Sequence, residues 1–351
     1  AMNQELLLPG HLYGMIIKER LDETLKGIDA QISRDLRNIE NGRGGRNLTL
    51  GTILDGDITY MNKTLSRQVD IGQKMQYFMA TGNLLSNSGM DLMQQTGFTV
   101  VAEKLNWLRY LAHFRCVHRG AFFSTMKTTT VRKILPENWG FICPVHSPDG
   151  APCGLLQHIT ATNLPVTHQE PINTKKVISL LLRLGCYNIN STVLNYNHFL
   201  PILLDGKLIG WMKEKDGPKI VDVLRKTKIM GTPDKIDSDS DSDDDNHEME
   251  NNNDNDDDSN KPKPLSSHHA LRILPMSTEI AYFPTMKSSS AETNGPFPGL
   301  FLATSPARML RPVTNLALEQ TEYIGPMEQV FLNIACTPDA VKSFENATQG
   351  G

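Results

Sequence analysis

Four residues that could bind a metal ion lie close together in one stretch of the sequence. With the spacing C-x2-H-x6-C-x4-H, they are Cys143, His146, Cys153 and His158. Tetrahedral zinc sites use thiolate and imidazole ligands, but this spacing matches no standard zinc motif, and three prolines stiffen the loop that would wrap the ion. We expect no metal here and keep zinc as the lesser alternative, which stoichiometric zinc in the purified chain would favour.

Other residues with catalytic potential are few. Asp55 and Asp57 flank Gly56 and could hold Mg²⁺, but Asp-Gly is the commonest tight-turn dipeptide, so we predict a turn. Cys143 could act as a nucleophile with His146, yet no third group that would orient the histidine is indicated. The sequence contains no Gly-rich phosphate loop, no GxSxG and no HExxH. Nothing in the sequence therefore supports a self-contained hydrolase or kinase.

A run of basic and aromatic residues is the best candidate for a binding site. Its basic members are His113, Arg115, His118, Arg119, Lys127, Arg132 and Lys133. The aromatic residues interleaved with them are Phe114, Phe122, Phe123 and Trp139. Basic groups neutralise phosphates and aromatic faces stack on bases, so the run predicts contact with nucleic acid. By composition alone, a solvated loop with ordinary surface charge is an equal alternative.

Length and composition bound the class of protein. The chain has 351 residues and is 39% hydrophobic, which predicts two to three domains with substantial cores. Its longest apolar run, 177–186, falls short of the roughly 20 residues that a membrane helix needs, so we expect no membrane span. The first ten residues lack the basic and apolar parts of a secretion signal. Five cysteines without a CxxC pair indicate a reducing, intracellular compartment.

The charge of the chain is unevenly distributed. Residues 234–263 carry thirteen acidic and three basic side chains, whereas the other 321 residues carry 32 basic and 26 acidic ones. Such an acidic tract cannot offset its ordering entropy by burying apolar surface, so we predict a disordered insert. Ser238, Ser240 and Ser242 each precede an Asp by three residues, which makes phosphorylation by acidophilic kinases a hypothesis. The remaining, basic part of the chain permits a polyanionic partner without requiring one.

Hydrophobic periodicity predicts helices in the first third of the chain. Apolar residues recur at steps of three and four at Leu21, Leu25, Ile28, Ile32 and Leu36. We predict helices over 14–36, over 58–79 with its end before Gly82, and over 99–114. After them, 116–133 shows no period and is predicted to be a long loop.

The later part of the chain mixes helix and strand signals. A helix is predicted over 175–185, ending at Gly185, and another over 218–228. Asp205-Gly206 separates two apolar runs and predicts a tight hairpin over 198–212. Strands are predicted over 270–283, 299–304 and 327–335. Together these elements predict an α+β fold, with a helical part followed by mixed α/β domains.

The two cysteines and two histidines lie within a longer series of residues in a characteristic order. Its members are Leu111, His113, Arg115, Pro136, Trp139, Gly140, Cys143, Pro144, Pro148, Gly150, Gly154 and Leu155. This series resembles the fork region of the second-largest subunit of multisubunit RNA polymerases. That family carries Leu-Ser-His-x-Arg-Arg, a loop, and then Pro-x-x-Trp/Tyr-Gly-x-x-Cys-Pro-x-x-Thr-Pro-Glu-Gly followed by Gly-Leu.

Further matches extend the resemblance over nearly the whole chain except the acidic tract. "YFMATGNLL" at 77–85 resembles the family's Ala-Thr-Gly-Asn segment, and "ARMLRPV" at 307–313 is similar to its Gly-Arg-x-x-Arg-Pro strand. Cys116, Ser147 and Asp149 depart from the usual Arg, Thr and Glu. The variant Pro-Val-His-Ser-Pro-Asp-Gly resembles the eukaryotic RNA polymerase I form of the family.

The resemblance implies a multidomain organisation. It implies the end of the protrusion over 1–75, the fork over 76–158 with a basic loop at 116–133, a first external domain over 159–232 and 264–290, an acidic insert over 233–263, and a second external domain over 291–351. The helical protrusion and fork would then precede the mixed α/β external domains.

The resemblance also implies a function. The assembled polymerase performs templated nucleotidyl transfer with Mg²⁺ held by the largest subunit, so this chain alone is expected to be inactive and to bind no cofactor. The implied partners are the other polymerase subunits, DNA and the RNA–DNA hybrid, in the nucleus and nucleolus. Two other classes remain as alternatives: a separate zinc-containing nucleic-acid module and a protein-interaction scaffold.

Individual residues receive expected roles in this setting. We expect Arg115, Arg119, Arg132 and Lys133 to contact phosphates, with Phe122 and Phe123 as wedges at the bubble edge. Asp149 is expected near the active centre. The structural members of the motif, which shape its backbone, are Gly140, Cys143, Pro144, Pro148, Gly150 and Gly154.

Overall fold

The computed structural model of the chain divides into two compact units. The helical unit consists of Leu6–Ile134 and Ile142–Ile159, and the sheet unit of Ala1–Glu5, Leu135–Phe141 and Thr160–Gly351. The structure describes residues 4–43, 49–86, 90, 92, 94–191, 199–231, 272–285 and 297–349, with the backbone alone at 121 and 344–349. The acidic tract and its three serines lie outside the described residues. Helices followed by several small sheets confirm the α+β prediction.

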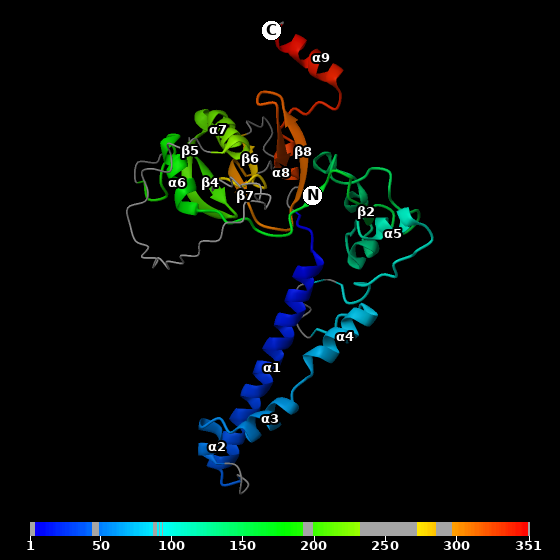
Figure 1. Ribbon diagram of the computed structural model, residues 1–351, viewed down its shortest axis with the longest axis vertical. Coiled ribbons are helices and arrows are strands. Elements are labelled where there is room, and N and C mark those ends of the chain that lie inside the picture. Colours follow the sequence, from blue (N-terminus) through cyan, green and yellow to red (C-terminus); the bar gives the residue numbers. More distant parts are fainter. Residues whose placement is uncertain are drawn as a thin grey trace, which may run out of the picture. The chain divides into compact units, whose positions relative to one another are not determined.

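A long helix, α1 (Pro9–Glu40), opens the helical unit (Figure 1). Its proline lies in the first turn, where a missing N–H costs little. The helix predicted over 14–36 is therefore confirmed and begins earlier than predicted. Leu21 and Leu25 are nevertheless exposed, because the buried stripe of α1 follows Ile16 and Arg20 instead. Among the described helices, none combines the length and apolar character needed to cross a membrane.

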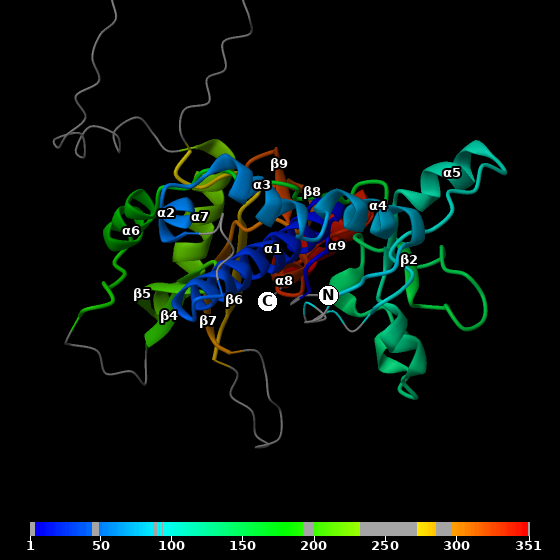
Figure 2. The ribbon, with the colours of Figure 1, turned by 90° about the horizontal axis from the view of Figure 1, so that it is seen from below.

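Three shorter helices pack along α1. They are α2 (Leu50–Leu54), α3 (Ile58–Ser66) and α4 (Ile71–Thr81), and both ribbon views show them beside α1 (Figures 1 and 2). The prediction of one helix over 58–79 is wrong, because the Asp70 carboxylate accepts a hydrogen bond from the Gln73 N–H at 3.2 Å and starts a new helix. The predicted end before Gly82 is confirmed by its φ of 66°.

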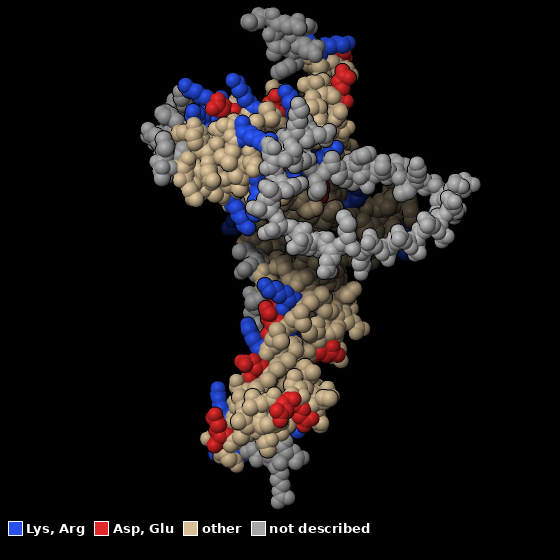
Figure 3. Space-filling model, turned by 60° about the vertical axis from the view of Figure 1, so that its left-hand side comes forward, with Lys and Arg blue, Asp and Glu red and all other residues tan. Residues whose placement is uncertain are grey.

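The predicted Asp-Gly turn is also confirmed, although it joins two helices. Gly56 has a φ of 66°, and the Asp57 carboxylate caps α3 by accepting from the Thr59 N–H at 3.0 Å. Along α1–α4, basic and acidic side chains are interspersed on the face drawn in Figure 3. These helices therefore present no large patch of one charge on that face.

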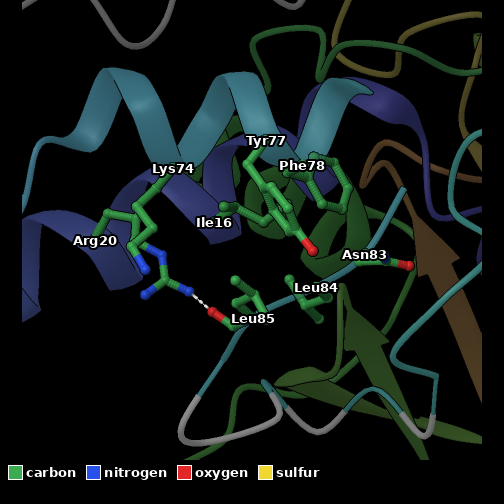
Figure 4. A pocket seen from close by; sticks show the side chains of 8 residues that line it. All are labelled: Ile16, Arg20, Lys74, Tyr77, Phe78, Asn83, Leu84 and Leu85. Atoms are coloured by element: carbon green, nitrogen blue, oxygen red, sulfur yellow. Dashed lines mark hydrogen bonds between the residues drawn. The ribbon is translucent and has the colours of Figure 1, made fainter. Parts of the chain in front are cut away.

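A small apolar core holds α1 and α4 together (Figure 4). Ile16 of α1 packs with Phe78 of α4 and with Leu84, which follows α4. The buried Arg20 lies at its edge and donates a hydrogen bond to the carbonyl of Leu85, as Figure 4 shows. Its other guanidinium nitrogen lies 2.5 Å from a Glu23 oxygen. A charge that is both hydrogen-bonded and paired can be buried in this way.

The second part of the helical unit contains the predicted binding loop. Helix α5 (Trp107–His113) is followed by β1 (Cys116–His118), the 3₁₀ turns η2 (Ala121–Thr125) and η3 (Thr130–Arg132), and β2 (Leu156–His158). The prediction of a long loop over 116–133 is thus wrong in part, because 116–118 form β1, which pairs antiparallel with β2.

The helix predicted over 99–114 is shorter than predicted. It starts only at Trp107, because the Asn106 side chain accepts a hydrogen bond from the Arg109 N–H at 2.7 Å. Val101 and Leu105 lie before the helix and are each 83% exposed. They are therefore not part of the apolar face that the periodicity predicted.

A four-stranded sheet forms most of the sheet unit. Its strands are β4 (Phe199–Leu204), β5 (Lys207–Lys213), β6 (Glu279–Phe283) and β7 (Gly299–Ala303), in the order β5-β4-β7-β6 with β4 and β7 parallel. The helices α6 (Thr174–Arg183) and α7 (Gly217–Met230), the latter preceded by the turn η6 (Glu214–Asp216), share its core. Both helix predictions are confirmed, with Gly185 at a φ of 86° after α6. The hairpin is confirmed too, because Asp205 and Gly206 have φ of 46° and 79°.

A smaller sheet completes this unit. It contains β3 (Leu164–Pro165), β8 (Met309–Asn315) and β9 (Gln320–Ile324), followed by α8 (Pro326–Gln329) and α9 (Pro338–Gln349). The strand predicted over 327–335 is wrong: residues 326–329 form α8, because the Glu328 carboxylate accepts a hydrogen bond from the Gly325 N–H at 3.0 Å. Of the strand predicted over 270–283, residues 270–271 lie outside the described residues, 272–278 are not strand, and β6 begins at Glu279.

A network of buried charged side chains joins α7 to β9 and α8. Arg225 Nη1 lies 2.5 Å from Glu322 Oε1, and Arg225 Nη2 lies 2.6 Å from Glu328 Oε2. The fully buried Lys228 lies 3.1 Å from Glu322 Oε1 and donates to two backbone carbonyls. Every cation in this network therefore has a carboxylate partner.

Candidate nucleic-acid interface

The first end of the basic loop is attached to the stretch 142–159 by backbone hydrogen bonds. In the β1–β2 pair, Cys116 lies opposite His158. The pairing continues beyond the strands, because the Arg119 N–H donates to the Leu155 carbonyl at 2.9 Å. Cys143 joins the same ladder through its N–H, which donates to the His158 carbonyl at 2.8 Å. The stretch 142–159 is thus built around strand β2.

The second end of the loop is attached by Arg132. Its Nη1 group donates to the carbonyls of Ala151 at 2.6 Å and Cys153 at 2.8 Å. Gly154 lies directly against this arginine, with a φ of 73°, and a Cβ added there would lie 2.5 Å from the Arg132 carbonyl oxygen. Only glycine permits both the backbone angle and this close approach.

The turn between these two attachments is stabilised by the Ser147 hydroxyl. It accepts a hydrogen bond from the Gly154 N–H at 3.0 Å and donates to the Leu156 carbonyl at 3.1 Å. Gly150 has a φ of 81° with open space beside it. Asp149 precedes it, is exposed, and has no hydrogen bond or ion pair with the part of the chain that the structure describes.

The seven predicted basic residues differ in their surroundings. His113 Nε2 accepts from the Glu103 N–H at 3.2 Å, and His118 Nδ1 accepts from the Gly120 N–H at 2.8 Å. Arg119 is half-buried, and burial lowers the pKa of its guanidinium. Of the arginines and lysines among them, Arg119, Lys127 and Lys133 have side chains without a hydrogen-bond or ion-pair partner within the described ranges.

The two predicted wedge residues lie together in η2. The rings of Phe122 and Phe123 are 5.7 Å apart and nearly perpendicular, at 77°. Phe122 is 42% exposed, so part of this residue is open to solvent. Phe114, which is 69% exposed, also makes an edge-on ring contact, with Tyr110.

Comparison with known proteins places this site in a family. Residues 100–163, which hold every one of these basic and wedge residues, match the family described as RNA polymerase Rpb2, domain 3, and residues 209–311 match the RNA polymerase I, Rpa2 specific domain. The chain is 42% identical over 340 residues to a probable DNA-directed RNA polymerase I subunit RPA2 of Schizosaccharomyces pombe, over 97% of this chain and 25% of that protein. The chain belongs to the family of RNA polymerase I second-largest subunits.

Other relatives in this family give the same extent of match. The RNA polymerase I subunit RPA135 of Saccharomyces cerevisiae is 40% identical over 345 residues, 98% of this chain and 24% of its own length. The RPA2 subunit of Mus musculus is 36% identical over 341 residues, 97% of this chain and 25% of its own length. The chain therefore spans about a quarter of the length of the curated relatives it matches.

The zinc alternative has no geometric support in this member of the RNA polymerase I family. Within the described residues, which include all four candidate ligands, no three His, Cys, Asp or Glu side chains are grouped to hold a metal ion. The rings of His146 and His158 instead stack in parallel, with centroids 3.5 Å apart. Burial lowers the pKa of His158, and the nearby basic side chains of His146, Arg109 and His113 lower it further.

The first half of the family motif, 135–141, belongs to the sheet unit. It contains the turn η4 (Pro136–Asn138). Gly140 has a φ of 81°, and a Cβ there would lie 2.7 Å from Arg311 Nε. That nitrogen donates to Gln329 Oε1 at 2.7 Å, and the Gln329 amide donates to the Trp139 carbonyl at 2.8 Å. Trp139 is therefore positioned by the sheet unit rather than by the basic loop.

Two features of the site were missed in the sequence. Ser147 was noted only as a departure from the family's Thr, yet its hydroxyl holds the turn. Arg132 was expected to contact phosphate, whereas its Nη1 group is occupied by two carbonyls. For Ser147, the available signal is a serine seven residues before a glycine in a proline-rich turn. For Arg132, no local signal in the sequence indicates that it bonds to backbone carbonyls.

Proposed function

We propose that this chain acts as part of the second-largest subunit of DNA-directed RNA polymerase I, forming the fork near the active centre and contacting template or downstream DNA during synthesis of the rRNA precursor. This role would place it in the nucleolus, with the other polymerase subunits, DNA and the RNA–DNA hybrid as partners. The observation that carries the proposal is the match of residues 100–163 to the polymerase domain that contains the basic loop.

The chemistry of the loop supports contact with phosphate. Arg119, Lys127 and Lys133 have no carboxylate partner in the described part of the chain, so their charge is available to an external anion. The exposed ring of Phe122 offers a face on which a base can stack. Positive groups and an aromatic face on one loop are what binding to separated strands requires.

The proposed activity belongs to the assembled enzyme. Templated nucleotidyl transfer needs metal ions that stabilise the attacking and leaving oxygens. We assign the Mg²⁺ to the largest subunit, as the family resemblance implies, and assign to this chain the binding and orientation of the strands. The isolated chain is then inactive.

Charge reversal in the loop tests this proposal. Arg119→Glu and Lys133→Glu, introduced together into the full-length subunit of assembled polymerase, should weaken template binding and slow elongation. The slope of log affinity against log salt concentration should fall by about one unit for each phosphate that is no longer neutralised. Lys26→Glu, at an exposed position on α1, is the matched control and should change neither quantity. Unchanged elongation and unchanged salt dependence in the double variant would contradict the proposed role.

A further inference from the structure

We propose that Arg132 is a positioning residue, which clamps the basic loop to the turn at 147–154 and does not contact the nucleic acid itself. The inference deepens the proposed function and rests on it, because positioning matters only if the loop acts on a nucleic acid. It separates Arg132 from Arg119 and Lys133, with which the sequence groups it.

The hydrogen bonds of Arg132 carry the first step. An Nη group has two hydrogens, and both of those on Nη1 are used, at 2.6 Å to the Ala151 carbonyl and at 2.8 Å to the Cys153 carbonyl. Bonds from a charged donor are stronger than those between neutral groups. The guanidinium is therefore tied to the turn, whereas the ammonium of Lys133 is exposed to solvent without a partner among the described residues.

The glycine opposite Arg132 is a second and independent observation. A Cβ on Gly154 would lie 2.5 Å from the Arg132 carbonyl oxygen and 2.8 Å from its Cβ. The close approach thus involves the backbone of Arg132 as well as its side chain. Substitution of Gly154 would push the turn at 147–154 away from the end of the basic loop at Arg132 without changing any charge.

The other end of the loop explains what the clamp achieves. The Arg119 N–H donates to the Leu155 carbonyl, next to Gly154. Residues 120–131 are therefore held at both ends by one short stretch, 147–156, which the Ser147 hydroxyl keeps in shape. Phe122 and Lys127 lie between the two attachments. If the Arg132 attachment is removed, the loop is held at one end only and its exposed side chains are no longer oriented.

Two kinds of substitution distinguish a clamp from a phosphate contact. Arg132→Lys keeps the charge but loses the forked guanidinium, and lysine still binds phosphate as a point charge. A phosphate contact would therefore tolerate Arg132→Lys, and a clamp would not. Gly154→Ala removes no charge, so it can act only through the position of the loop.

The test uses full-length subunits in assembled polymerase, with the variants Arg132→Gln, Arg132→Lys, Gly154→Ala and Lys133→Gln. The first three should each slow elongation by between about tenfold and a hundredfold, the range expected for groups displaced by about 1 Å. The salt slope of template binding should stay unchanged in these three and fall by about one unit in Lys133→Gln. Arg132→Gln and Gly154→Ala break the same attachment, so their effects on the elongation rate should not add. The double variant should therefore elongate no more slowly than the slower of the two single variants.

Hydrogen exchange supplies a readout that does not depend on nucleic acid. Amides of residues 120–131 should exchange faster in Arg132→Gln and Gly154→Ala than in the wild type, while Lys133→Gln leaves them unchanged. Circular dichroism of each variant shows that the rest of the chain remains folded. If Gly154→Ala fails to fold, the two Arg132 variants still decide the matter.

Two results would overturn the inference. One is a salt slope that falls by about one unit in Arg132→Gln together with wild-type elongation in Arg132→Lys, which is the behaviour of a phosphate contact. The other is unchanged exchange over 120–131 in the Arg132 variants. Failure of the proposed function looks different: Lys133→Gln and the charge-reversed loop would then leave binding and its salt slope unchanged, whatever the exchange data show.

Discussion

Two regions of the chain, the charged network around Arg225 in the sheet unit and the basic loop in the helical unit, use positive charge in opposite ways. In the sheet unit, the partly buried Arg225 and the fully buried Lys228 lie within 3.1 Å of the oxygens of buried carboxylates. In the helical unit, Arg119 and Lys133 have no carboxylate partner among the residues that the structure describes. Burying a charge costs free energy unless a partner and hydrogen bonds compensate. A cation with a buried partner therefore serves the fold, and an unpaired cation near the surface is available for binding.

Arg132 shows that charge alone does not separate these two uses. It lies in the same basic run as Lys133, but its Nη1 group is bonded to backbone carbonyls in the manner of a structural arginine. The partners of each basic side chain, rather than its charge, therefore separate structural cations from those available for binding. Substitutions that remove a partner test this division directly.

The largest effect is expected from removing a carboxylate of the buried network. Glu322→Ala leaves Lys228 without its ion pair and Arg225 with one of its two, inside the protein. The free energy of unfolding of the sheet unit should fall by about 3–5 kcal/mol, the usual cost of an uncompensated buried charge. The loss in free energy of unfolding can be measured by denaturant unfolding, with the hydrogen exchange of the β6 amides as the probe.

An exposed ion pair is the matched control for that experiment. Asp222 and Lys226 on α7 lie 2.8 Å apart, with side chains 61% and 47% exposed. Asp222→Ala should change the free energy of unfolding by less than about 1 kcal/mol. If Glu322→Ala and Asp222→Ala lowered the free energy of unfolding equally, burial would not determine how much these ion pairs stabilise the fold.

A smaller effect is expected from pH. Burial, followed by the nearby Glu328 carboxylate, raises the pKa of Glu279 to about 7 from an ordinary 4.5. The folded state therefore binds more protons than the unfolded state between these values, so this carboxyl's contribution to stability falls as the pH rises from 4.5 to 7. The slope is on the order of 1.4 kcal/mol per pH unit. Measurements of the free energy of unfolding of the wild type between pH 4.5 and 7 should show this slope.

Glu279→Gln should remove that slope, because an amide does not titrate. Glu322 should behave in the opposite sense: burial raises its pKa, but Lys228 and Arg225 outweigh burial and lower it. Its contribution is therefore present above the ordinary pKa and is lost as the pH falls below it. Equal pH dependence of stability between pH 4.5 and 7 in the wild type and in Glu279→Gln would show that Glu279 is not protonated in the folded chain in this window.

The sequence predicted best those features that depend on neighbouring residues. The positive φ values of Gly82, Gly185 and Gly206 follow from the preference of glycine for left-handed backbone, and all three are observed. The errors at 58–79 and 99–114 are of the same local kind. In both, a capping side chain, Asp70 or Asn106, starts a helix within an apolar pattern that continues through it.

Features that depend on distant residues could not be predicted in this way. Strands β1 and β2 are three residues each and lie about 40 residues apart, so neither has a periodicity of its own. The network around Arg225 joins it to carboxylates about 100 residues later. The two carbonyls on Arg132 belong to a turn whose residues carry no signal for an arginine. The family resemblance indicated the candidate site, and only the structure distinguishes Arg132, which is bonded to carbonyls, from the unpaired cations beside it.

The smallest effect on stability is expected in the loop itself. Arg119→Gln and Lys133→Gln remove cations that have no carboxylate partner in the described ranges, so each should change the free energy of unfolding by less than about 0.5 kcal/mol. For Arg119 the change is expected to be toward greater stability, because its half-buried guanidinium is partly desolvated without a compensating pair. Thermal and denaturant unfolding of these two variants, compared with that of Glu322→Ala, measures the difference in stability between loop and network substitutions. A loss above about 1 kcal/mol in Lys133→Gln would mean that this side chain has a structural partner after all, and the division between structural and binding cations would then fail at this residue.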